Sequence, residues 1–154
     1  NQTGQLSCKS CPANQKSENS SAAKCDDCPR GEKSDPDSAK CTKCDGGEAG
    51  TGVNGACEQC KAGHYRQSKE VVNGIVTATT TDATKCVICP AGWTSEEGST
   101  KCQLCEAGSY NRNEEGKECS PCTKGQYRKA GMKASSCRHC IAGQYQTEEG
   151  QASW

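Results

Sequence analysis

The residues of this chain with the clearest chemical potential are its cysteines, because all 16 of them fall in C-x-x-C pairs. Such pairs serve three chemistries in proteins: zinc binding by thiolates, thiol–disulfide exchange at one activated thiol, and structural disulfide bonds. The eight pairs are Cys8/Cys11, Cys25/Cys28, Cys41/Cys44, Cys57/Cys60, Cys86/Cys89, Cys102/Cys105, Cys119/Cys122 and Cys137/Cys140. The choice among the three chemistries decides which compartment and which class of function the sequence indicates.

Two successive pairs have a spacing that is compatible with a zinc ribbon. The numbers of residues between pairs, however, are 13, 12, 12, 25, 12, 13 and 14, whereas separate zinc modules would alternate between a spacing within the site and a linker spacing. The chain also lacks the basic or hydrophobic surface of many cytosolic zinc arrays, and its small glycine-rich loops are typical of secreted disulfide scaffolds. We therefore expect oxidised cysteines, no metal ion and no other cofactor.

A redox role like that of thioredoxin needs a single pair at the start of a helix, where the thiol pKa is depressed. Here eight equivalent pairs lie in loops, and no helix signal follows them. The pairs are therefore interpreted as structural.

Spacing alone leaves two disulfide connectivities open. A crossed scheme, with Cys8–Cys25 and Cys11–Cys28 as its first bonds, uses all 16 cysteines within the chain. A sequential scheme leaves Cys8 and Cys140 for partners beyond the ends, and its bonds are Cys11–Cys25, Cys28–Cys41, Cys44–Cys57, Cys60–Cys86, Cys89–Cys102, Cys105–Cys119 and Cys122–Cys137. Because both ends of the sequence fall inside a repeat, we favour the sequential scheme and expect the array to continue beyond both ends.

The composition is too polar for a fold built on a hydrophobic core. The hydrophobic share is 31% with the cysteines included, and phenylalanine is absent. Globular domains usually contain about 45–50% apolar residues, so covalent bonds must replace the core here. Lys plus Arg and Asp plus Glu each number 19 without long runs of one sign, which gives no reason to expect nucleic acid as a partner. No apolar run approaches the roughly 18 residues of a membrane span, so we expect no membrane insertion of this segment.

The cysteine pairs mark an internal repeat with a period of about 16 residues. Its unit reads C-x2-C-x-A-G-x-aromatic, and the glycine predicts a tight turn with positive φ. Less regular repeats span 1–67, an insertion spans 68–85 and regular repeats span 86–154. The aromatic side chains are predicted to pack across a neighbouring disulfide or the next repeat, and they belong to Tyr65, Trp93, Tyr110, Tyr127 and Tyr145. The predicted fold is thus an elongated array of small disulfide-rich repeats, made of short β-hairpins and turns with little regular secondary structure and no large core.

The insertion carries β-branched residues on both sides of Asn73-Gly74, which is a type I′ hairpin signal. We expect a protruding two-stranded hairpin in which Val71-Val72 faces Ile75-Val76; a flexible surface loop is the alternative. The threonine-rich run that follows would also suit O-linked sugar.

The cadence CPAGxY…EGxxxC resembles the ephrin-receptor-like cysteine-rich repeat and, more distantly, the modules of tumour necrosis factor receptors. The segments that carry the resemblance are Cys89-Pro90-Ala91-Gly92-Trp93, Cys105 to Tyr110, Cys122 to Tyr127 and Cys140 to Tyr145. The resemblance implies extracellular, elongated, non-enzymatic modules and does not imply one ligand. Cys11 to Asn14 and Cys41 to Gly47 depart from the pattern.

We find no constellation of residues that would support catalysis. His64 and His139 lie in different repeats, and the acid pairs near Glu96, Glu114 and Glu148 recur at one repeat position, as a solvated loop edge would. Sequons for N-linked sugar occur at Asn1 and Asn19. The expected protein is an extracellular, secreted or cell-surface glycoprotein and not an enzyme.

Two classes of function fit these expectations. In the first, the chain is a stiff structural building block that assembles with copies of itself or with other extracellular proteins into a filament or coat. In the alternative, it is the ligand-binding or stalk region of a receptor ectodomain. Uniform repeats without a concentrated apolar or charged patch favour the building block.

Overall fold

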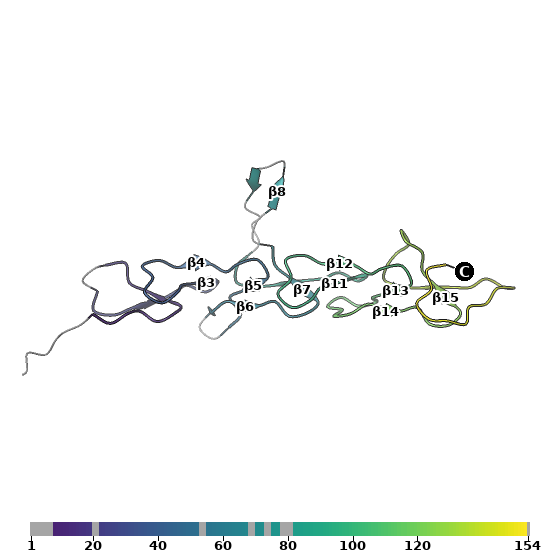
Figure 1. Ribbon diagram of the computed structural model, residues 1–154, viewed down its shortest axis with the longest axis horizontal. Helices are drawn as coiled ribbons and strands as arrows, with labels where there is room; N and C mark the ends of the chain where they lie inside the picture. Colours follow the sequence, from purple (N-terminus) through teal and green to yellow (C-terminus); the bar gives the residue numbers. More distant parts are fainter. Residues whose placement is uncertain are drawn as a thin grey trace, which may run out of the picture.

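The computed structural model describes residues 8–19, 22–52, 55–67, 70–72, 75–77 and 82–153. Over these residues all regular secondary structure consists of short antiparallel hairpins, arranged in eight two-stranded sheets. Figure 1 shows an elongated molecule in which the hairpins follow one another from the purple end to the yellow end. The predicted fold class is confirmed.

Seven of the eight hairpins belong to the repeats, and each is built in the same way. The first strand directly follows the turn residue, which is a glycine in all but the first repeat, and the second strand consists of the two residues inside the next C-x-x-C pair. The strand pairs are β1 (Gln15–Lys16) with β2 (Asp26–Asp27), β3 (Glu32–Lys33) with β4 (Thr42–Lys43), β5 (Glu48–Ala49) with β6 (Glu58–Gln59), β7 (His64–Tyr65) with β10 (Val87–Ile88), β11 (Trp93–Thr94) with β12 (Gln103–Leu104), β13 (Ser109–Tyr110) with β14 (Ser120–Pro121), and β15 (Gln126–Tyr127) with β16 (Arg138–His139).

The disulfides follow the sequential scheme. The bonds are Cys11–Cys25, Cys28–Cys41, Cys44–Cys57, Cys60–Cys86, Cys89–Cys102, Cys105–Cys119 and Cys122–Cys137. Cys8 and Cys140 form no disulfide within this chain, as the sequential scheme requires. Each bond closes the base of one hairpin, so we count the repeats from the second cysteine of each pair. Repeats 1 to 8 begin at Cys11, Cys28, Cys44, Cys60, Cys89, Cys105, Cys122 and Cys140.

The sulfur atoms take the place of a hydrophobic core. In the first seven C-x-x-C pairs the second cysteine is buried, and its exposed fraction falls to 0% at Cys89 and Cys122. The first cysteines are only half-buried. A ring of this size contributes about 3 kcal/mol in the chain-entropy model, so one bond per repeat can order a unit that buries few apolar side chains.

The insertion forms the predicted hairpin. Strand β8 (Glu70–Val72) pairs with β9 (Ile75–Thr77), with Val71 opposite Val76 and Val72 opposite Ile75, and the hairpin projects sideways from the middle of the molecule (Figure 1). The expected turn at Asn73-Gly74 lies outside the described residues. Strands β7 and β10 pair on either side of the insertion, so repeat 4 keeps the same hairpin as its neighbours.

Candidate functional site

With most cysteines used in structural bonds, the most regular arrangement in the molecule is the joint between one repeat and the next. At six of the seven joints, the turn residue of one repeat donates its N–H to the following repeat. The acceptor is the backbone carbonyl three places after the turn residue of that following repeat. The donor and acceptor residues are Asn14 and Ser34 (2.9 Å), Gly47 and Arg66 (2.7 Å), Gly63 and Ser95 (2.9 Å), Gly92 and Asn111 (2.7 Å), Gly108 and Arg128 (2.8 Å), and Gly125 and Gln146 (2.9 Å). At these six joints successive repeats therefore meet through the same backbone contact.

A second set of backbone bonds runs in the opposite direction across the joint. A residue in the polar loop of the later repeat donates its N–H to the carbonyl of the buried cysteine that begins the earlier repeat. The pairs are Asp37 and Cys11 (3.0 Å), Gly98 and Cys60 (2.8 Å), Glu115 and Cys89 (3.3 Å), and Gly150 and Cys122 (2.8 Å). All four donor residues have positive φ, from 60° to 72°, so one loop conformation recurs along the array.

Side chains complete the joint, and the residue three places after the turn residue supplies them. We call this position the joint residue. Five joint residues are buried and donate a side-chain hydrogen bond to the carbonyl of the first strand residue in the preceding repeat. The bonds are Ser34 to Gln15 (2.8 Å), Arg66 to Glu48 (2.6 Å), Ser95 to His64 (2.8 Å), Asn111 to Trp93 (2.8 Å) and Arg128 to Ser109 (2.5 Å). These five are also the buried polar residues of the described part of the chain, and each of the five side chains makes at least one hydrogen bond across the joint.

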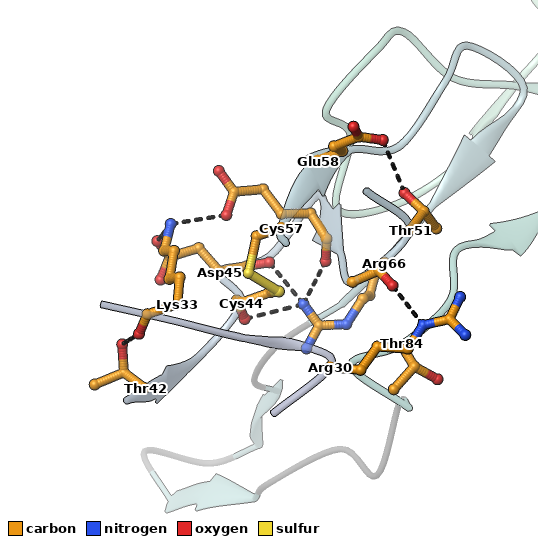
Figure 2. Close-up of a disulfide and its surroundings, with 12 residues drawn as sticks. Arg30, Lys33, Thr42, Cys44, Asp45, Thr51, Cys57, Glu58, Arg66 and Thr84 are labelled. Carbon is orange, nitrogen blue, oxygen red and sulfur yellow. Dashed lines mark hydrogen bonds and ion pairs between the residues drawn. A yellow bond between two sulfur atoms is a disulfide. The ribbon is translucent and has the colours of Figure 1, made fainter. Parts of the chain in front are cut away.

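The two arginines at joint positions reach furthest into the preceding repeat. Figure 2 shows the Arg66 guanidinium beside the Cys44–Cys57 disulfide, where its Nη1 also donates to the carbonyls of Cys44 at 3.0 Å and Asp45 at 2.7 Å. Its Nε is buried without a hydrogen-bond partner among the described atoms.

Arg128 makes the same kind of contact at the joint between repeats 6 and 7. Its Nη2 donates to the carbonyls of Cys105 at 2.5 Å and Glu106, and its Nη1 donates to that of Met132 at 3.1 Å. Burial lowers the pKa of the Arg128 guanidinium from its usual value, and the carbonyl dipoles around it compensate for the lost water.

The joint between repeats 2 and 3 is different, because its joint position is Gly50, which has no side chain. Here Arg30 of repeat 2 donates from Nε to the Gly50 carbonyl at 2.7 Å. Lys33 of repeat 2 contacts Asp45 of repeat 3 at 2.7 Å (Figure 2). It also contacts Glu48 of repeat 3 at 2.8 Å. The hydrogen bonds to Asp45 and then Glu48 raise the pKa of Lys33. Basic side chains of the earlier repeat thus take over the bridging role.

The turn glycines also bring repeats that are two apart into contact. A methyl group at Gly47 would overlap the carbonyl of Gly98, two repeats further on, and one at Gly108 would overlap that of Gly150. Both glycines have φ near +80° and are buried, so glycine is needed there for its conformation and for its small size. Repeats 3 and 6 are therefore each held by the next repeat and by the one after it.

The five aromatic side chains that were predicted to pack between repeats are buried to very different degrees. Tyr127 is buried at 7% exposure, whereas Tyr65 and Tyr110 are half-buried. Trp93 is 38% exposed and Tyr145 is 85% exposed, so packing of the Tyr145 ring between repeats is not seen. The side chains buried between repeats are instead mostly those of the joint residues, which the sequence pattern did not predict. Their only signal in the sequence is a polar residue at a fixed place after the turn residue.

The glycan and acid-pair positions that the structure describes lie at the surface. Asn19 is exposed in the loop of repeat 1, and Asn1 lies outside the described residues. The acid pairs that begin at Glu96, Glu114 and Glu148 are exposed, which confirms them as a solvated loop edge. Among the described residues, no group of three or more histidine, cysteine or acidic side chains is placed to hold a metal ion.

No protein-family profile and no curated protein matches this chain. In the part of the chain that the structure describes, no helix has the length and apolar character needed to cross a bilayer. Seven disulfides in 154 residues favour a secreted or extracellular location, because the cytosol keeps thiols reduced.

Proposed function

We propose that this chain is a non-enzymatic, extracellular structural protein: a stiff, disulfide-stapled and glycosylated building block of a secreted or cell-surface filament or coat. The observation that carries the proposal is the repetition of one joint, with the same backbone bond at six of seven interfaces. Because each repeat meets the next through the same contact, the repeats line up along one axis and form a rod.

Stiffness follows from the number of independent contacts at each joint. Three of the seven joints, between repeats 1 and 2, 4 and 5, and 5 and 6, combine a backbone bond at the turn residue, a return bond to the buried cysteine and a buried side-chain donor, and three others have two of these contacts. The contacts between repeats two apart oppose bending, because a hinge at one joint would break them as well. The disulfide in each of repeats 1 to 7 keeps its unit closed when a joint opens.

The surface offers features that suit lateral assembly and a glycan. Hairpin β8–β9 projects from the rod and has two open strand edges, which could add a strand to a neighbouring molecule. Asn19 is exposed and stands in a sequon, so an attached glycan would shield a repeat that has no aromatic residue.

One observation favours the alternative, a ligand-binding or stalk region of a receptor ectodomain. Trp93 and Leu104 lie opposite each other in the β11–β12 hairpin with exposures of 38% and 49%. Exposed apolar side chains of this kind often form the centre of a binding surface. The resemblance to ephrin-receptor-like repeats is compatible with either function.

Electron microscopy of the chain secreted from an oxidising host and purified without reductant tests the proposal. We expect filaments or sheets with a regular repeat along their axis. Discrete rods that stay single at high protein concentration would contradict the building block, and the Trp93–Leu104 hairpin would then be the first surface to test for ligand binding.

A further inference from the structure

We propose that Cys57 and Cys119 are sites of thiol–disulfide exchange with a small extracellular thiol. The thiol bonds to Cys57 or Cys119 and releases a thiolate on the buried partner, Cys44 or Cys105. A buried arginine beside each partner stabilises the released thiolate, so these two disulfides open before the others. This chemistry goes beyond the proposed structural role, because it gives two of the seven disulfides a modification site of their own.

The two buried arginines occupy equivalent places beside their disulfides. Arg66 donates from Nη1 to the Cys44 carbonyl at 3.0 Å, and Arg128 donates from Nη2 to the Cys105 carbonyl at 2.5 Å. Figure 2 shows the Arg66 guanidinium beside the yellow bond between the Cys44 and Cys57 sulfur atoms. A nearby positive charge favours the ionised form of a thiol, so either arginine would stabilise a thiolate formed at the buried cysteine.

Burial strengthens this effect, because charges interact more strongly where water is excluded. Arg66 and Arg128 are 2% and 1% exposed, and Cys44 and Cys105 are 2% and 3% exposed. The acceptors of the guanidinium bonds described above are backbone carbonyls, which solvate the charge without neutralising it. The Arg66 Nε is buried and has no hydrogen-bond partner among the described atoms. The guanidinium therefore has an unused donor for a new anion.

Access decides which sulfur of each disulfide is attacked. Cys57 and Cys119 are half-buried, whereas Cys44 and Cys105 are buried. A thiol from solvent therefore reaches Cys57 or Cys119 first. The leaving sulfur is then the buried one, which is the sulfur that lies beside the arginine.

Backbone hydrogen bonds would keep the buried cysteine in place after its disulfide opens. The Cys44 N–H donates to the Gly31 carbonyl at 2.9 Å, and the Cys44 carbonyl accepts from Arg66. The Cys105 N–H donates in the same way to the turn residue of the preceding repeat, at 2.9 Å. None of these bonds uses a sulfur atom, so the released thiolate stays next to the guanidinium.

The exchange step balances without a further reactant. The small thiol loses its proton to solvent, and its thiolate attacks the Cys57 sulfur. A new disulfide forms between the small thiol and Cys57, the Cys44–Cys57 bond breaks, and its electron pair goes to the Cys44 sulfur. The sulfur of the small thiol is oxidised and that of Cys44 is reduced. A better stabilised leaving thiolate leaves faster, and Arg66 supplies that stabilisation.

The chain contains its own comparison, because other joints have a neutral residue where repeats 3 and 6 have an arginine beside them. Ser95 lies at the joint that follows the Cys60–Cys86 bond, and Asn111 lies at the joint that follows the Cys89–Cys102 bond. Cys86 and Cys102 are half-buried, as Cys57 is. These two disulfides therefore share the access of the proposed sites but lack the charge beside the leaving sulfur.

Opening the two sites would change the rod at defined places. The Cys44–Cys57 bond closes repeat 3 and the Cys105–Cys119 bond closes repeat 6. Their exchange removes the cross-link from those two repeats and leaves the other five disulfides closed. A small thiol would therefore make the rod bendable at repeats 3 and 6 only.

The experiment treats the oxidised chain with 2-mercaptoethanol and follows each cysteine over time. This thiol is neutral, so charged side chains such as Glu58 and Lys85 do not bias its approach. Samples are quenched in acid, free thiols are alkylated, and the chain is cut at glutamate for mass spectrometry. Cleavage after Glu48 and Glu58 places Cys44 and Cys57 on separate peptides. We expect adducts on Cys57 and Cys119 to form at least fivefold faster than adducts on Cys86 and Cys102.

Two variants at residue 66 separate the charge of Arg66 from its packing. Arg66→Met removes the charge and should slow the Cys57 adduct at least fivefold, while Cys119 in the same molecule reacts at its wild-type rate. A merely structural arginine predicts the opposite, because a looser joint exposes the disulfide and speeds the reaction. Arg66→Lys retains a positive charge and should restore part of the rate. Ser95→Met, the matched control at a neutral joint residue, should not slow the Cys86 adduct.

Several results would overturn the proposed sites. These are equal adduct rates at Cys57, Cys119, Cys86 and Cys102, an early adduct on Cys44 with Cys57 left free, or a faster Cys57 adduct in Arg66→Met. The wild-type rates decide the question by themselves if Arg66→Met is not secreted. Early adducts confined to Cys57 and Cys119, with alkylated Cys44 and Cys105, would support it.

Discussion

The Nε atom of Arg128 in repeat 7 donates a hydrogen bond of 2.5 Å to the carbonyl of Ser109 in repeat 6. The guanidinium is withdrawn from water, since Arg128 is 1% exposed. The buried charge is solvated by backbone carbonyls of the neighbouring repeat rather than by a carboxylate. The relationship explains how a protein with few apolar residues can build a rigid joint.

Arg128→Met should loosen the joint between repeats 6 and 7. The methionine fills part of the volume but leaves the carbonyls of Cys105, Glu106 and Ser109 without their donor, which we expect to cost about 2–4 kcal/mol. Hydrogen exchange should show faster exchange at the Gly108 amide, which bonds the Arg128 carbonyl. Arg112→Met, at an exposed arginine of repeat 6, is the control. Equal protection in the two variants would contradict the proposed role of the buried guanidinium.

Gly108→Ala should be far more damaging than Gly125→Ala. The two glycines have similar φ values of +82° and +76°, so alanine meets a comparable backbone strain of about 1 kcal/mol at either site. Only at Gly108 does the new methyl overlap another repeat, at the Gly150 carbonyl. Limited proteolysis of the single chain should therefore cut Gly108→Ala near residues 148–151 and leave Gly125→Ala resistant. Similar cleavage of both variants would mean that the contact between repeats two apart carries little stability.

The sequence predicted the parts of the fold that depend on local patterns. Cysteine spacing gave the repeat, Gly92 and its equivalents gave the turns, and Asn73-Gly74 pointed to the inserted hairpin, whose strands β8 and β9 pair as expected. Connectivity was open because both schemes satisfied the spacing. The structure selects the sequential one, in which each bond closes the base of one hairpin.

The joint residues escaped prediction for a physical reason. Ser95, Asn111 and Arg128 differ in size and charge, so no single residue type marks that position, and these three share only the ability to donate a hydrogen bond. Their acceptors are backbone carbonyls in another repeat, which no side-chain pattern can reveal. The aromatic position drew attention because its residue type recurs, yet Tyr145 there is 85% exposed.

Reductant, but not a metal chelator, should unfold the chain. The bonded cysteines are oxidised and do not ligate metal, so treatment with EDTA or phenanthroline should leave the amide NMR spectrum unchanged. Dithiothreitol should reduce the chemical-shift dispersion of this spectrum to that of an unfolded chain. Each disulfide-closed loop that is lost removes about 3 kcal/mol from a repeat with almost no apolar core. A spectrum that changes with chelator before any reductant is added would return the zinc interpretation to consideration.

Acid should release the loop that ends the insertion. Asp82 accepts bonds from the hydroxyl of Thr84 at 2.6 Å and from its N–H at 2.9 Å, and these bonds lower the pKa of Asp82 from 3.8. Because the folded pKa lies below the unfolded one, the carboxylate stabilises the fold above pH 3.8, and this contribution is lost as pH falls through the folded value. The Thr84 amide resonance should titrate with a midpoint below 3.8 and should stop titrating in Asp82→Asn. A midpoint at or above 3.8 would contradict the capping role.

Deleting residues 69–81 should leave the rod intact and remove only the side projection. The separation between Cys60 and Cys86 would fall from 26 to 13, the separation of Cys44 and Cys57. Because β7 and β10 pair on either side of the insertion with Tyr65 opposite Val87, the shortened repeat 4 can close as its neighbours do. We expect thermal stability within about 1 kcal/mol of the wild type, since loop-closure entropy changes by only about 0.6 kcal/mol per halving of a loop.

In electron micrographs, filaments of the deletion variant should keep their axial repeat but associate less side by side. Unchanged bundles would exclude the β8–β9 hairpin as the lateral contact, and unfolding of repeat 4 would show that the insertion is part of the joint.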